Sequence, residues 1–129
     1  MFGRVLKVLG LPRIDRKNAS ANFEKINESI SKVIKNKNSI MIFPEGKRSN
    51  QKDLLPFKKG AAYISKDFQL PIIPVVTHNA HNLMRKGEVW LRSGEITIEI
   101  LNPINHSEEL TVEEMTTKIY NLIDEKLKI

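Results

Sequence analysis

The residues best suited to chemistry lie at positions 43–49, which read Phe-Pro-Glu-Gly-Lys-Arg-Ser and follow a short apolar run. Proline ends a strand, and glycine lets the backbone turn tightly and come close to a ligand. Arg48 can form paired hydrogen bonds to a phosphate group, and Glu45 can accept a hydrogen bond from a hydroxyl or orient a neighbouring base. Because open α/β sheets bind ligands where their strands end, the segment predicts an anion-binding site. Taken alone, it also suits an ordinary turn with solvated charges.

Three further blocks accompany this segment along the chain. Residues 14–16 read Ile-Asp-Arg, residues 54–61 read Leu-Leu-Pro-Phe-Lys-Lys-Gly-Ala, and residues 70–76 read Leu-Pro-Ile-Ile-Pro-Val-Val. In this order and spacing the four blocks resemble the glycerolipid acyltransferase family that includes bacterial 1-acylglycerol-3-phosphate acyltransferase. The resemblance extends over about residues 8–101.

The resemblance implies roles for five residues of the chain. Arg16 matches an arginine thought to bind the phosphate of the acyl acceptor. Glu45 and Gly46 match a block that helps to bind the glycerol phosphate, and Arg48 matches the arginine of that block. Lys58 is a further candidate for the same anion. These five are the expected substrate-binding residues.

The histidines do not match the catalytic block of that family. Its general base is the histidine of an H-x-x-x-x-D motif, which takes a proton from the acceptor hydroxyl while the aspartate orients the ring. Five positions after His78, His81 and His106 stand a leucine, a lysine and a threonine. All three also follow the block at 43–49, whereas the family histidine precedes the Ile-Asp-Arg block. We therefore assign no catalytic residue.

His78 and His81 also have the spacing of a pair of metal ligands on one side of a turn. No third ligand is evident nearby in the sequence. We expect both to be loop histidines and expect no metal site.

The resemblance implies a role in phospholipid biosynthesis. The reaction would transfer a fatty acyl group from acyl-CoA or acyl carrier protein to 1-acyl-sn-glycerol-3-phosphate and give phosphatidate. Both donors are substrates, and no cofactor is expected. The chain would carry the acceptor-binding blocks but not the catalytic histidine and aspartate. The alternative is a non-catalytic, anionic-lipid-binding or degenerate fragment.

Composition and charge favour an anionic partner. The chain has a net charge of +6, and the excess of lysine and arginine lies ahead of residue 105. The chain contains no cysteine, which excludes a thiolate nucleophile and a cysteine-based zinc site. Its basic groups lack the interleaved aromatic residues of a nucleic-acid platform, so we expect no nucleic-acid partner. No apolar run approaches the roughly 20 residues of a membrane span. We expect a peripheral protein on the cytoplasmic face of a membrane.

Hydrophobic periodicity predicts one α/β domain over residues 1–129. The resemblance makes this a mixed β-sheet flanked by helices, a glycerol-phosphate acyltransferase-like fold that is N-terminally truncated. Helices are predicted over residues 2–9, 20–36 and 60–68 and from Thr111, buried strands over 39–43 and 72–76, and a half-buried hairpin over 88–92 and 95–100. The buried faces of the hairpin would carry the alternating isoleucines at positions 96, 98 and 100.

Two details of the predicted fold concern its ends. Thr111 and Glu114 have the spacing of a helix capping box, and Leu110 with Met115 has the spacing of a hydrophobic staple. A first strand and helix of the family fold would be missing, which leaves a sheet edge and apolar surface uncovered. We therefore expect the chain to associate with itself, with a membrane or with a complementing chain.

Overall fold

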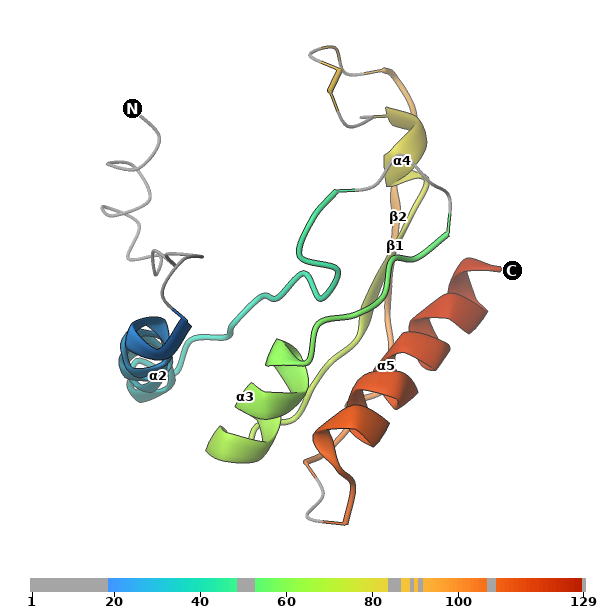
Figure 1. Cartoon of the computed structure of the whole chain (residues 1–129). Coiled ribbons are helices and arrows are strands. Elements are labelled where there is room, and N and C mark those ends of the chain that lie inside the picture. The colour runs from blue at the N-terminus through green and yellow to red at the C-terminus, as the bar shows by residue number, and fades with distance from the viewer. Residues whose placement is uncertain are drawn as a thin grey trace. The chain divides into compact units, whose positions relative to one another are not determined.

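The computed structural model, shown in Figure 1, divides the chain into two units, residues 1–41 and residues 42–129. The helix expected over residues 2–9 lies outside the part of the chain that the structure describes. None of the described helices is both long and apolar enough to cross a bilayer. The described residues are 19–48, 53–83, 87–88, 90, 92–106 and 109–128.

The first unit contains helix α2, Ala19–Lys35, which confirms the helix predicted over residues 20–36. The helix ends where Lys37 adopts the left-handed conformation, with φ of 56°. The backbone N–H of Asn38 then donates to the carbonyl of Val33 at 3.1 Å. This closing pattern satisfies a carbonyl that the last helical turn leaves without a partner.

Residues 39–43 do not form the predicted buried strand. They have no regular secondary structure, and the side chains of Met41 and Phe43 are 80% and 79% exposed. A strand buried on both faces needs hydrogen-bonded neighbours along its edges, and none of the described strands pairs with this segment. The prediction is wrong because an apolar run specifies a strand only where another strand is available to pair with it.

The second unit contains strands β1, Val75–His78, and β2, Thr97–Ile100, which pair antiparallel. An isolated bridge between Ile72 and Ile104 lies just beyond them. The strand predicted to begin at Ile72 instead begins after Pro74, because proline has no N–H to donate to a strand ladder.

Strand β2 does not pair with the segment that precedes it in sequence. In the predicted hairpin, residues 88–92 would pair with residues 95–100. Residues 88, 90 and 92 have no regular secondary structure, while 89 and 91 lie outside the described part of the chain. The partner of β2 is β1. The hairpin prediction fails because alternation identifies a strand but does not identify its partner.

The covered face of the sheet carries Glu99 rather than the isoleucines. Glu99 lies opposite Val76, which is 1% exposed, whereas Ile98 and Ile100 are 62% and 70% exposed. Helix α5, Val112–Leu127, packs on the Val76 side. The predicted burial of the isoleucines is therefore wrong. Alternation fixes which residues share a face, and the packing of α5 decides which face is covered.

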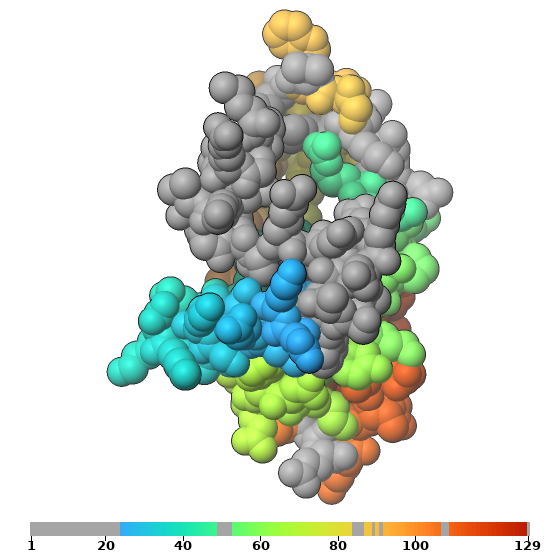
Figure 2. All heavy atoms as spheres, turned by 60° about the vertical axis from the view of Figure 1, so that its left-hand side comes forward, coloured from blue at the N-terminus to red at the C-terminus, as the bar shows by residue number. Residues whose placement is uncertain are grey.

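The core of the second unit lies where helix α3, Gly60–Phe68, and α5 meet β1. The bounds of α3 confirm the helix predicted over residues 60–68. Figures 1 and 2 both show α3 and α5 side by side. Burial of each valine, isoleucine or methionine side chain stabilises the unit by about 1.5–3 kcal/mol. The buried cluster consists of Ala62, Val76, Ile104, Met115, Ile119 and Ile123.

Helix α5 begins with the predicted capping box. The Thr111 hydroxyl oxygen accepts the backbone N–H of Glu114 at 3.2 Å, and the Glu114 carboxylate accepts the backbone N–H of Thr111 at 2.8 Å. Each bond satisfies a backbone donor that the first turn cannot pair internally. Local sequence alone therefore sets where this helix begins.

Replacing Thr111 by alanine should lower the free energy of unfolding by about 1 kcal/mol, because the N-cap acceptor is lost. Urea denaturation followed by circular dichroism measures the change. Thr117→Ala is the matched control, since Thr117 is exposed in the middle of α5 and alanine favours a helix. Equal stability of the two variants would contradict the role of the cap.

Acid should destabilise the second unit. The hydrogen bond from Lys126 holds the pKa of Glu99 below its ordinary value of 4.5, and the hydrogen bond from Lys59 does the same for Glu113. A carboxyl with a lowered folded-state pKa stabilises the fold fully above its unfolded pKa, and this contribution is lost as pH falls through the folded pKa. The urea midpoint should therefore decrease below pH 4.5 more steeply in the wild type than in Glu99→Gln. Identical pH profiles would contradict this.

Candidate functional site: a turn and the loop that holds it

The turn at residues 43–46 is formed as the sequence predicts. The backbone N–H of Gly46 donates to the carbonyl of Phe43 at 3.0 Å. Gly46 adopts φ of 71°, a left-handed conformation in which a side chain is strained. Glycine at this position therefore allows the chain to reverse before the basic residues Lys47 and Arg48.

The loop over residues 53–58 is bonded to this turn at two points. The Glu45 carboxylate accepts the backbone N–H of Leu55 at 3.0 Å. The carbonyl of Pro44 accepts the backbone N–H of Lys58 at 2.7 Å. A Cβ atom built on Gly46 would lie 3.7 Å from Cγ of Lys58. The structure thus brings together three of the predicted site residues, Glu45, Gly46 and Lys58.

The loop is in turn anchored to the core of the second unit. The ring of Phe57 packs edge-on against the ring of Tyr120 in α5, with centroids 5.1 Å apart and planes inclined by 76°. Leu54 packs against the same core, and Lys59 forms an ion pair with Glu113. The position of the turn therefore depends on burial of the loop against α5.

Of the two predicted guanidinium groups, the structure describes only that of Arg48. Arg48 is exposed and follows the turn directly. Arg16 lies outside the described residues, so the convergence of Arg16 and Arg48 on one anion stays a prediction.

The described turn and loop present an excess of positive charge. Residues 43–48 and 53–59 hold four basic side chains against two carboxylates. Within the described part of the chain, the side chains of Arg48 and Lys58 form no ion pair, whereas Lys59 is paired with Glu113. Lys47 likewise has no ion pair among the described residues, so three cations are available to an anionic ligand here, and two of them, Arg48 and Lys58, are predicted site residues.

The histidines lie apart from this arrangement in the chain and have other neighbours. His78 Nε2 lies 3.4 Å from Oε2 of Glu99, whose other oxygen accepts a bond from Lys126 at 2.9 Å. His78 is the last residue of β1, and His81 belongs to the short helix α4, Ala80–Leu83, so the prediction that both are loop histidines is wrong. Among the described residues, no three histidine, aspartate or glutamate side chains are grouped so that they could hold a metal ion.

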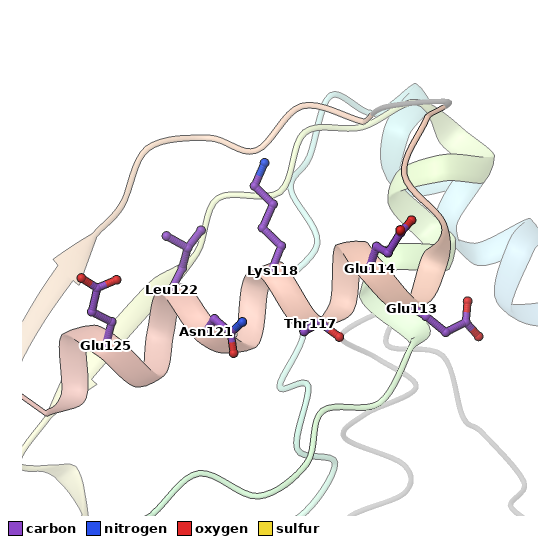
Figure 3. Close-up of a pocket in the computed structure, with 7 residues that line it drawn as sticks. All are labelled: Glu113, Glu114, Thr117, Lys118, Asn121, Leu122 and Glu125. Atoms are coloured by element: carbon purple, nitrogen blue, oxygen red, sulfur yellow. The ribbon is translucent and has the colours of Figure 1, made fainter.

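Helix α5 carries an open depression on its outer surface, drawn in Figure 3. Three of its lining side chains are glutamates and one is a lysine, so the depression repels rather than attracts a phosphate. It contains none of the predicted site residues. Its lining is Glu113, Glu114, Thr117, Lys118, Asn121, Leu122 and Glu125.

The match to a family model identifies the class of protein. The model described as Acyltransferase matches residues 1–78, more than half of the chain. The chain therefore belongs to this acyltransferase family. The matched region includes the Ile-Asp-Arg block, the turn and the loop.

Three of the curated relatives share one printed name, 1-acyl-sn-glycerol-3-phosphate acyltransferase. The protein of Cocos nucifera is 41% identical over 104 residues, which covers 81% of this chain and 34% of that protein. The Saccharomyces cerevisiae protein is 32% identical, and the match covers 98% of this chain and 43% of that protein. The Salmonella typhimurium protein is 33% identical, and the match covers 98% of this chain and 51% of that protein. The chain thus spans a third to a half of the length of these relatives.

A solved structure supports the α/β fold. The crystal structure of the 1-acyl-sn-glycerophosphate (LPA) acyltransferase PlsC from Thermotoga maritima superposes with a TM-score of 0.73 at 26% identity. The match covers 81% of this chain and 43% of that protein. The predicted fold class is confirmed by this likeness.

Sequence reasoning missed the backbone partners of the site. The carbonyl of Pro44 and the N–H of Leu55 join the turn to the loop. Both are backbone groups, so a sequence motif does not reveal them. The one available signal is the shared family resemblance of the two blocks, which implies that they act together.

Gly46→Ala should lower the free energy of unfolding by about 1 kcal/mol, because alanine is strained at a φ of 71°. The added Cβ makes only an ordinary contact with Lys58, so no clash adds to this cost. Gly60→Ala is the control, since no atom lies within 4 Å of its Cβ position at the start of α3. Chemical denaturation of both variants measures the difference, and a Gly46 variant as stable as the control would refute the left-handed turn.

Proposed function

We propose that the chain supplies the acceptor-binding part of an acyltransferase of phospholipid biosynthesis. The acceptor is 1-acyl-sn-glycerol-3-phosphate, the donor is acyl-CoA or acyl carrier protein, and the product is phosphatidate. The names of the relatives support this substrate class. The observation that carries the proposal is the bonding of the Gly46 turn to the loop of Lys58. The turn leads to the exposed Arg48, the loop carries Lys58, and neither side chain forms an ion pair within the described residues.

The proposed reaction forms an ester and releases a thiol. The free hydroxyl oxygen of the acceptor attacks the thioester carbonyl carbon, the carbon–sulfur bond breaks, and the hydroxyl proton passes to a base. Arg48 and Lys58 would bind the acceptor's phosphate and thereby fix the position of its hydroxyl. They take no part in the proton transfer.

The base is not assigned to a residue of this sequence. None of its histidines is followed five positions later by aspartate. This observation favours a second candidate function, in which the chain binds an anionic lipid without turnover. Both functions use the same cations, and both include a peripheral contact with the cytoplasmic face of a membrane, where anionic lipids attract basic groups.

Arg48→Ala should weaken binding to vesicles that contain phosphatidate or lysophosphatidate by about tenfold, because a charge-assisted hydrogen bond is lost. Co-sedimentation with vesicles measures the affinity. Arg92→Ala is the matched control, since it removes the same charge from an arginine that is already paired with Glu88. Equal losses of affinity in the two variants would mean that net charge alone explains the effect, and this would contradict the site.

A turnover assay tests whether this chain alone completes the reaction. The purified chain is supplied with labelled acyl-CoA and lysophosphatidate. We expect lipid binding without phosphatidate formation. Turnover would establish the enzyme and show that a base other than the family's motif is present, and the absence of both binding and turnover would refute both functions.

A further inference from the structure

We infer that Glu45 is a positioning residue, which holds the loop of Lys58 against the turn and does not itself bind the anion. The inference rests on the proposed function for the nature of the ligand, a phosphate. It differs from the role implied by the family resemblance, in which Glu45 helps to bind the glycerol phosphate.

The first argument is the partner that Glu45 already has. Its Oε2 accepts the backbone N–H of Leu55 at 3.0 Å in a partly buried position. A backbone N–H in such a place needs an acceptor, and the bond to a carboxylate is stronger than a bond to a neutral group. The Glu45 carboxylate therefore gives a hydrogen-bond acceptor to a backbone N–H that lies ten positions further along the chain.

The second argument is electrostatic. A phosphate and a carboxylate repel each other at short distance, so a glutamate in direct contact would weaken the binding of the anion. The Glu45 carboxylate is instead directed at the N–H of Leu55. Arg48 and Lys58 are then left to the ligand.

The third argument is that the position of Lys58 depends on the position of the loop. Its backbone N–H donates to Pro44 at 2.7 Å, and its Cγ lies close above Gly46, where a Cβ would be 3.7 Å away. Leu55 and Lys58 belong to the same short segment. If the bond from Leu55 to Glu45 is lost, we expect the segment to loosen and the Lys58 side chain to leave its place over the turn.

Amide hydrogen exchange tests the positioning without any ligand. In Glu45→Ala, the N–H groups of Leu55 and Lys58 should exchange about tenfold faster, whereas Glu45→Gln should show a smaller increase because its amide oxygen still accepts. Asp67→Ala is the control, since Asp67 is exposed on α3. Unchanged exchange in Glu45→Ala would overturn the inference.

Anion titrations followed by the amide signals of Gly46 and Arg48 test the role in binding. The two probes are inorganic phosphate and sn-glycerol 3-phosphate. Glu45→Ala should weaken both by the same factor, and Glu45→Gln should largely restore both. Adding Lys58→Ala should then cost less in the Glu45→Ala background than in the wild type, because coupled residues are not additive.

A loss confined to sn-glycerol 3-phosphate would overturn the inference, because it would mean that Glu45 contacts a glycerol hydroxyl. Full additivity of the two substitutions would overturn it as well. If the wild type binds neither probe, the proposed function fails, and the exchange of Leu55 still decides whether Glu45 positions the loop.

Discussion

The edge-to-face contact between Phe57 and Tyr120 is the interaction on which the candidate site depends. Such aromatic pairs add about 0.5–1.5 kcal/mol to the burial of the rings themselves. The contact joins the loop to helix α5, whose buried residues form the core. Two hydrogen bonds then join the loop to the turn, through Pro44 and Glu45. An exposed turn with little burial of its own thereby takes its position from the core.

Charges in the site region divide into structural and available groups. The ion pair between Lys59 and Glu113 fastens the start of α3 to the start of α5, and Glu45 is bonded to the backbone of the loop. Arg48 and Lys58 form no ion pair within the described residues. A glutamate in a basic turn is thus compatible with anion binding, because its charge is used within the protein.

Within the described residues the three longer helices were predicted well from the sequence, whereas the short helix α4 and the strands were not. The bounds of α3 and the capping box before α5 agree with prediction, and α2 differs by one residue at each end. The expected strand at 39–43 is absent from the described structure, and β2 pairs with β1 instead of forming a hairpin. Of the five predicted site residues, the structure brings Glu45, Gly46 and Lys58 together, and Arg48 is exposed just after the turn, while Arg16 lies outside the described residues.

The sequence by itself determined the helix limits, the turn at Gly46 and the acyltransferase blocks. Helical and capping hydrogen bonds connect residues a few positions apart, so their determinants lie within one short stretch of chain. The tertiary structure decided the partner of β2, the exposed side of its isoleucines and the bond from Leu55 to Glu45. These features join distant residues, and whether they form depends on which segments the packing of α5 brings side by side.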